Sequence, residues 1–267
     1  SFVLQPQGKV DAVVRATRVA DDVIVLDVDQ GFGEAVLARL RRFRLRMKVE
    51  LAALPDWACL ALRGPEAVAA TGEAAGGSAA GAVEEASRAL VVPARWPGAP
   101  GVDVLGQGVG VPEGVRLCGP EALVTLRVEA GVPAMGAELT ERTIPAESGL
   151  VDAAVSFTKG CFTGQELVAR IDARGGRVPR RLRGVVVAAA SLGEGPLPPA
   201  GAEVVNGDKV VGQTTTVALS PGLDAAVALA YVRREVEPPA TLALRWGDEG
   251  ASEVPAEVRT LPLVGAD

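Results

Sequence analysis

The octapeptide Lys159-Gly160-Cys161-Phe162-Thr163-Gly164-Gln165-Glu166 is the most informative stretch of this 267-residue sequence. It places a cysteine after a lysine and a glycine, just before a helical pattern over residues 165–171. A helix N-terminus and a nearby cation both stabilise a thiolate, the reactive form of cysteine. The stretch therefore predicts a reactive Cys161. A turn shaped by two glycines, with Cys161 filling a gap, would explain the same residues.

Matching residues continue on both sides of the octapeptide. Arg170 and Arg174-Gly175 follow it. The residues that precede it are 127–133, Gly136, Glu138-Leu139, Ile144-Pro145 and Glu147-Ser148-Gly149-Leu150. The combination resembles the YgfZ-type folate-binding relatives of the glycine-cleavage T-protein, whose signature is K-G-C-[FY]-x-G-Q-E. Two motifs in the right order make a chance match improbable.

The resemblance implies a fold and a function. The fold would be α+β, a multidomain T-protein-like ring with ferredoxin-like α+β domains and a small C-terminal β-barrel. The protein would bind tetrahydrofolate or a derivative in a central channel. It would support iron–sulfur cluster assembly or repair, with iron–sulfur client or assembly proteins as partners. The alternative is a tetrahydrofolate-dependent aminomethyltransferase of the T-protein type, disfavoured by the presence of Cys161. Whether the protein is an enzyme stays open; an accessory factor is favoured over a folate-dependent one-carbon transferase.

The resemblance also assigns site residues. Cys161 would be the reactive or transient-ligand thiol, because a stable cluster needs about four thiolates. No stably bound metal or cluster is therefore expected. Glu147 would accept hydrogen bonds from the pterin, or else face water as a loop glutamate. Asp11, in Gly8-Lys9-Val10-Asp11, would be an acid near the folate, or a turn carboxylate beside Lys9. The remaining motif or binding residues are Lys159, Gly160, Phe162, Gly164, Gln165, Glu166, Arg170 and Arg174.

An arginine-rich segment follows the octapeptide. Six arginines crowd residues 170–183, with only Asp172 to offset them after Arg170. Such a cluster could hold the folate glutamate tail, another anion or an acidic partner. A solvated basic face would have the same composition.

The length and the pattern of the chain predict three domains. Residues 1–50 would be the remainder of a first α+β domain whose N-terminal portion is missing, because no helix precedes its opening sheet. Residues 51–180 would form a second α+β domain ending in the Lys-Gly-Cys motif, and residues 181–267 the β-barrel. We expect an irregular surface connection over residues 131–149, because glycine and proline punctuate it.

Apolar periodicity predicts the individual elements. Residues 2–4, 10–19 and 23–28 read as an antiparallel meander, and residues 34–43 and 120–129 as helices. Further strands are expected over residues 47–53, 57–62, 90–94 and 102–105. Residues 71–81 are so rich in alanine, glycine and serine that their secondary structure cannot be assigned from the sequence. The barrel strands would cover residues 184–188, 203–205, 209–215, 226–232 and 241–246, with Asn206-Gly207 as a two-residue hairpin turn.

Composition excludes several functions. The chain has no histidine, which removes Ser-His and Cys-His catalysis, and its charge of -6 argues against general nucleic-acid binding. No apolar run is long enough to predict a membrane span, so we expect a cytoplasmic protein without membrane or nucleic-acid partners. Cys59 and Cys118 sit in apolar surroundings and are expected to be small core residues.

Overall fold

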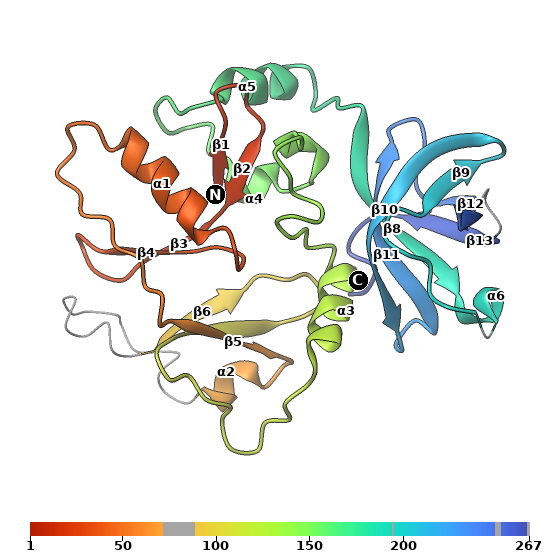
Figure 1. Cartoon of the computed structure of the whole chain (residues 1–267), viewed down its shortest axis with the longest axis horizontal. Helices are drawn as coiled ribbons and strands as arrows, with labels where there is room; N and C mark the ends of the chain where they lie inside the picture. Colours follow the sequence, from red (N-terminus) through yellow and green to blue (C-terminus); the bar gives the residue numbers. More distant parts are fainter. Residues whose placement is uncertain (72–88, 194, 249–251, 266–267) are drawn as a thin grey trace. The chain divides into compact units, whose positions relative to one another are not determined.

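The elements of the protein group into two compact units. The computed structural model describes residues 1–71, 89–193, 195–248 and 252–265 (Figure 1). Unit 1 contains Ser1 and residues 12–117, and unit 2 contains residues 2–11 and 118–267. The three predicted domain ranges stay a prediction.

Unit 1 is an α+β layer structure. A hairpin of β3 and β4 precedes helix α1, and β7 lies between β5 and β6 in a three-stranded antiparallel sheet. Arg15 binds the hairpin to the sheet, because it contacts Asp27 at 2.8 Å and Asp103 at 2.7 Å. The elements are β3 (Arg15–Arg18), β4 (Ile24–Asp27), α1 (Gly33–Phe43), β5 (Ala58–Arg63), α2 (Ala67–Ala70), β6 (Leu90–Ala94) and β7 (Gly101–Gly106).

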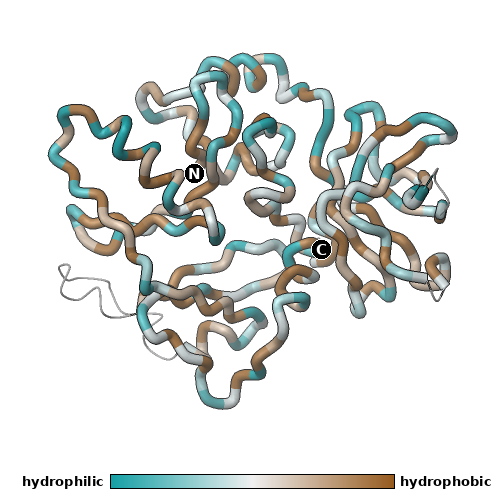
Figure 2. The backbone as a smooth tube through the Cα atoms, viewed as in Figure 1, coloured by the Kyte–Doolittle hydropathy of each residue, from teal (hydrophilic) through white to brown (hydrophobic). Residues whose placement is uncertain are grey.

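Unit 2 contains a closed six-stranded antiparallel barrel, in the order β10-β11-β8-β13-β12-β9. Its core is almost entirely valine, alanine and leucine, and β11 is buried along eight consecutive residues. Figure 2 shows the hydrophobic stretches along these strands. The strands are β8 (Arg180–Ala188), β9 (Glu203–Asn206), β10 (Lys209–Ser220), β11 (Ala225–Arg233), β12 (Ala240–Trp246) and β13 (Ser252–Arg259).

The remaining elements of unit 2 carry the sequence motifs. Helix α3 begins with proline, which suits the first helical position, and ends at Gly131 in the left-handed conformation. Within its described residues, the unit also contains a short hairpin and four further helical segments. The bounds are β1 (Phe2–Leu4), β2 (Val10–Val13, which begins here), α3 (Pro120–Ala130), η3 (Pro145–Glu147), α4 (Val151–Ala154), α5 (Gln165–Ala173) and α6 (Ala189–Leu192).

The prediction of an α+β fold with a C-terminal β-barrel is confirmed, and most predicted elements are present. The expected strand over residues 47–53 is wrong, because these residues pair with no described strand and most are exposed. The 206–207 turn is shifted by one residue: Asn206 pairs with Lys209, so Gly207 and Asp208 form the loop. Most of the ambiguous 71–81 segment lies outside the described residues.

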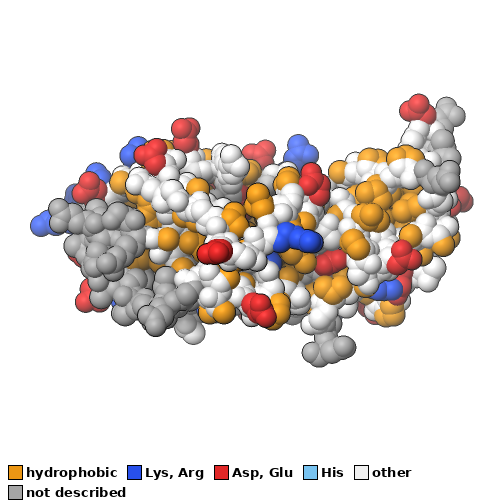
Figure 3. Space-filling model, turned by 90° about the horizontal axis from the view of Figure 1, so that it is seen from below, with side chains coloured by type: hydrophobic (Ala, Val, Ile, Leu, Met, Phe, Trp, Pro, Cys, Tyr) orange, Lys and Arg blue, Asp and Glu red, His pale blue; other side chains and the backbone are white. Residues whose placement is uncertain are grey.

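The connection over residues 131–149 is irregular, as predicted, but it is not a surface loop. Glu138, Leu139, Thr143, Glu147 and Ser148 are all buried. Buried polar groups need partners, and these residues find them in the barrel and within the connection itself. On one face, Figure 3 shows apolar side chains exposed among scattered acidic and basic groups. Among the described residues, no helix has the length and apolar character needed to cross a membrane.

Candidate functional site

Residues 159–164 of the octapeptide form a loop that leads into α5, and Gln165 and Glu166 begin that helix. Cys161 is exposed. The side chain of Gln165 fixes the loop, because its Oε1 accepts a hydrogen bond from the Phe162 N–H at 3.0 Å. Lys159 lies over the ring of Phe162, with Nζ 4.9 Å from the centroid. The motif thus presents one thiol to solvent on a loop held from both ends.

Gly164 brings the octapeptide against the turn between β1 and β2. Gly164 has φ +80°, and a Cβ there would lie 2.5 Å from the Gln5 carbonyl oxygen and 2.9 Å from the Gly8 Cα. Gly8 also has φ +80°, and its Cβ would lie 2.5 Å from the Cβ of Leu167. Only glycine tolerates both the conformation and the contact. The Gly-x-x-Asp turn and the Lys-Gly-Cys motif are therefore adjacent.

Asp11 follows this turn on β2 and is half-buried. The hairpin is held to the 131–149 connection as well, because the Val10 N–H donates to the Thr143 carbonyl at 3.0 Å. Asp11 thus belongs to the same assembly of segments as Cys161 and Glu147. Its role in binding folate stays a prediction.

Glu147 is buried and paired, so the alternative of a loop glutamate facing water is wrong. Its Oε2 accepts a hydrogen bond from Arg180 Nε at 3.2 Å and from the Ile144 N–H at 3.4 Å. The Arg180 guanidinium also lies over the ring of Tyr231, 4.4 Å from its centroid. The second oxygen, Oε1, accepts no hydrogen bond from the described residues and keeps acceptor capacity for a ligand.

Glu138 belongs to the upstream motif, but sequence reasoning assigned no role to its buried carboxylate. Its side chain is 0% exposed and contacts Arg127 at 2.8 Å. The Ala134 N–H donates to Oε2 at 2.9 Å, while Thr215 and Thr216 donate to Oε1 at 2.6 and 2.5 Å. Burial alone raises the pKa of Glu138, but Arg127 and these hydrogen bonds outweigh it and hold the pKa below its ordinary value.

A β-bulge makes that arrangement possible. Successive side chains of a regular strand point to opposite faces, so Thr215 and Thr216 could not both reach one oxygen. The register of β10 against β11 shifts between Thr214 and Thr216. The bulge re-aims one threonine, and Glu138 locks the irregular connection onto the barrel.

Glu129, at the end of α3, is a second buried carboxylate that sequence reasoning did not single out. Its Oε1 accepts a hydrogen bond from the hydroxyl of Ser220 at 2.5 Å. Its other oxygen accepts none from the described residues. Glu129 and Glu147 can thus each still bind an N–H group of a ligand, whereas Glu138 has both oxygens engaged.

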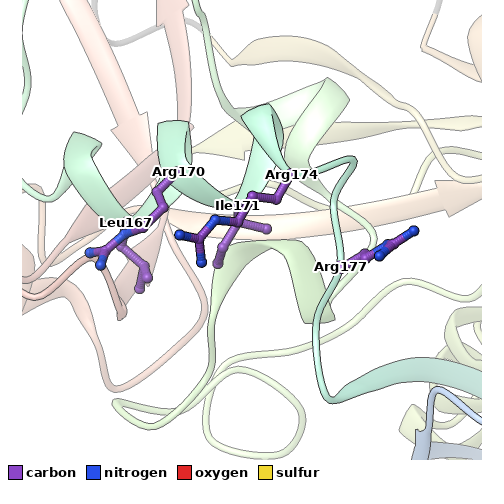
Figure 4. Close-up of a pocket in the computed structure, with 5 residues that line it drawn as sticks. All are labelled: Leu167, Arg170, Ile171, Arg174 and Arg177. Carbon is purple, nitrogen blue, oxygen red and sulfur yellow. The ribbon is translucent and has the colours of Figure 1, made fainter.

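The arginine-rich segment divides into two groups. Arg180 binds Glu147, Arg181 donates to the Gly176 carbonyl at 2.8 Å, and Arg183 is half-buried in β8. Arg170 and Arg174 instead extend from α5, with Arg177 beyond its end, and line an open hollow with Leu167 and Ile171 (Figure 4). A second cavity of about 260 Å³ lies between η3, α4 and α5, with Asp152, Asp172 and Arg181 as its charged lining.

The other two cysteines are exposed, so the prediction that they fill the core is wrong. Partial burial, with nearby Asp103, raises the pKa of Cys59 to about 11. Within the described ranges, no three histidine, cysteine, aspartate or glutamate side chains are grouped to hold a metal ion.

Comparison with known proteins identifies the family. The glycine cleavage T-protein C-terminal barrel domain matches residues 180–264, the barrel described above. Aminomethyltransferase from Rubrobacter xylanophilus is 30% identical over 277 residues, covering 97% of this chain and 70% of that protein. The chain belongs to the aminomethyltransferase family. Aminomethyltransferase from Streptomyces avermitilis is 37% identical over 155 residues, and this match spans 40% of its length.

A solved aminomethyltransferase shares the fold. The crystal structure of glycine cleavage system aminomethyltransferase T from Bartonella henselae matches with a TM-score of 0.78 and 21% identity. The match covers 99% of this chain and 75% of that one. The resemblance read from the octapeptide is therefore confirmed for the T-protein-like superfamily, and the narrower YgfZ-type assignment stays a prediction for this aminomethyltransferase-family chain.

Proposed function

We propose that this protein binds tetrahydrofolate or a derivative and acts as a T-protein-like aminomethyltransferase. The observation that carries the proposal is the similarity to an aminomethyltransferase along 97% of the chain. Members of this family transfer a one-carbon unit to tetrahydrofolate. This reading was the alternative at the level of sequence, and it now takes precedence over the iron–sulfur role.

The buried carboxylates fit the chemistry of a pterin. The pterin ring presents an amino group and ring N–H groups, which bind best to a carboxylate held in a fixed position away from bulk water. Glu129 is fixed by Ser220, and Glu147 is fixed by Arg180. Each keeps one oxygen for a ligand, so these two residues are the candidates to hold the pterin.

Asp11 is the candidate acid. A carboxylate beside the reacting amine of the folate could exchange a proton with it during transfer. The close packing of Gly8 against Gly164 and Leu167 fixes the turn that precedes Asp11. Precise placement of this kind is what proton transfer requires, since the groups must come within hydrogen-bond reach.

Calorimetric titration with tetrahydrofolate tests the binding. The Glu129→Gln variant keeps an oxygen for Ser220 but puts an amide donor where the ligand needs an acceptor. We expect it to bind tetrahydrofolate at least tenfold more weakly than the wild type, because a hydrogen bond to a charged group contributes about 1.5–3 kcal/mol. Glu121→Gln, on the exposed first turn of α3, is the matched control and should bind like the wild type. Equal affinity for tetrahydrofolate in all three proteins would show that Glu129 does not bind this ligand.

The exposed thiol favours a second candidate function. Cys161 is presented on a braced loop that an aminomethyl transfer does not obviously need. A folate-binding accessory factor for iron–sulfur proteins would use such a thiol as a transient ligand, or as a nucleophile toward a client protein. This candidate shares folate binding with the first and differs in the reaction.

Replacing Cys161 by alanine separates the two candidates. In cells that lack the native copy, the accessory role predicts that iron–sulfur enzyme activity fails while the purified variant stays folded. Aminomethyl transfer from a loaded lipoyl protein should then be absent from the wild type as well. If transfer occurs and Cys161→Ala supports normal iron–sulfur enzymes, the aminomethyltransferase reading holds and the accessory role is excluded. Cys59→Ala serves as the control for loss of a thiol.

A further inference from the structure

The hollow beside α5 carries a chemistry that the proposed function does not use. It has a volume of about 680 Å³, and three guanidinium groups and two apolar side chains line it. The lining residues are Leu167, Arg170, Ile171, Arg174 and Arg177. All of them belong to unit 2.

The three arginines of the hollow have no acidic partner. Arg170, Arg174 and Arg177 are exposed, and none of them forms an ion pair with any residue that the structure describes. Asp172, the acidic residue between Arg170 and Arg174 in the sequence, lines the second cavity, which shares Ile171 with the hollow. In a chain with a net charge of -6, three uncompensated cations in one hollow form a local positive potential.

The arrangement of these side chains suits a ligand with several anionic groups. Arg170 lies on α5 and Arg174 is the C-cap residue of this helix, four positions later, or about 6 Å along the axis at about 1.5 Å per residue. Figure 4 shows both side chains on the same side of the helix, beside Leu167 and Ile171, while Arg177 extends from the segment after it. Guanidinium groups bind carboxylates and phosphates through paired hydrogen bonds. The apolar floor between them suits a methylene stem.

The helix alone does not explain the cluster. Cations near a helix C-terminus are stabilised by the macrodipole, which accounts for Arg174 at the end of α5. Two like charges at positions i and i+4 destabilise a helix, however, so Arg170 and Arg174 oppose each other without an anion. Arg177 lies beyond Gly175 and Gly176, outside the reach of the helix dipole.

We propose that this hollow binds a small multivalent oxyanion, a ligand with two or more carboxylate or phosphate groups along a short stem. Arg170 and Arg174 hold two anionic groups, and Arg177 holds a further one at the edge. Leu167 and Ile171 contact the stem. The hollow shares no lining residue with the proposed pterin-binding carboxylates Glu129 and Glu147, so its test is separate from the test of pterin binding.

Calorimetric titration of the full chain with two probes tests the proposal. Tripolyphosphate represents a phosphate ligand and triglutamate represents a carboxylate ligand. The Arg170→Gln/Arg174→Gln variant removes two charges from the hollow, and Arg41→Gln/Arg42→Gln removes two from the exposed end of α1 as a control of equal charge. Circular dichroism confirms that each variant is folded.

We expect at least one probe to bind the wild type, and the hollow variant to bind it at least a hundredfold more weakly. The control should bind like the wild type. Tighter binding of triglutamate would identify a carboxylate ligand, and tighter binding of tripolyphosphate a phosphate ligand. The proposal is overturned if neither probe binds at millimolar concentration, or if both double variants lose affinity equally, since that result would indicate general charge attraction.

Discussion

Replacing Gly164 by alanine should disrupt the contact between the two motifs of unit 2. The new Cβ would lie 2.5 Å from the Gln5 carbonyl oxygen and 2.9 Å from the Gly8 Cα, and both are backbone positions that cannot swing away. The left-handed conformation costs an alanine about 1–2 kcal/mol. Overpacking adds about 1–3 kcal/mol. We therefore expect a loss of about 2–5 kcal/mol in the free energy of unfolding.

Gly175→Ala is the matched control for this change. Gly175 has φ +72° at the other end of α5, and a Cβ there would meet no atom within 4 Å. It should cost only the conformational part, about 1–2 kcal/mol. Urea unfolding followed by circular dichroism measures both losses. Hydrogen exchange shows whether the weakened amides of Gly164→Ala lie in α5 and the β1–β2 hairpin. An equal loss in the free energy of unfolding in the two variants would contradict the close contact of Gly164 with Gln5 and Gly8.

Two further predictions concern Glu138 and the thiols. Glu138→Gln should cost about 3–5 kcal/mol at neutral pH, because it leaves Arg127 half-buried beside a neutral group. The lowered pKa of Glu138 stabilises the fold above its unfolded value near 4.5, and this stability is lost as the pH falls through the folded pKa. The difference in the free energy of unfolding between the wild type and the variant, measured with urea, should thus become smaller below about pH 4. A difference that stays constant with pH would contradict the lowered pKa of Glu138. In a disulfide-exchange assay at pH 8, Cys161 should react faster than Cys59, whose pKa of about 11 leaves roughly one thiolate in a thousand. Equal rates in single-cysteine variants would contradict this.

Local sequence signals predicted the parts of this protein that depend on neighbouring residues. The loop before α5 and five of the six barrel strands, β8 to β12, follow from spacing, glycine and apolar periodicity. Strand β13 was missed because it contains Pro255, which lacks the N–H that a strand interior normally uses. It pairs with β8 only at residues 257–259, so Pro255 lies outside that ladder.

The buried polar centre could not be read from sequence for a different reason. Glu138 accepts hydrogen bonds from Thr215 and Thr216, which are 77 and 78 residues away in the sequence. The contact depends on a β-bulge in β10 that no local sequence pattern predicts. The 131–149 segment has the glycines and prolines of a surface loop, yet Glu138 and Glu147 are buried because the barrel and nearby arginines supply their partners. The hydrogen bond that fixes Glu129 likewise comes from Ser220, which lies 91 residues further along the chain.

The activity that we propose for this protein is the transfer of a one-carbon unit to tetrahydrofolate. The most direct test incubates the purified protein with an aminomethyl-loaded lipoyl protein and tetrahydrofolate, and follows the methylene-folate product with isotopically labelled one-carbon groups. We expect labelled product that depends on the protein and on folate and that falls strongly in the Asp11→Asn variant. Tetrahydrofolate binding without any labelled product would contradict the transferase claim and leave the thiol-dependent accessory role.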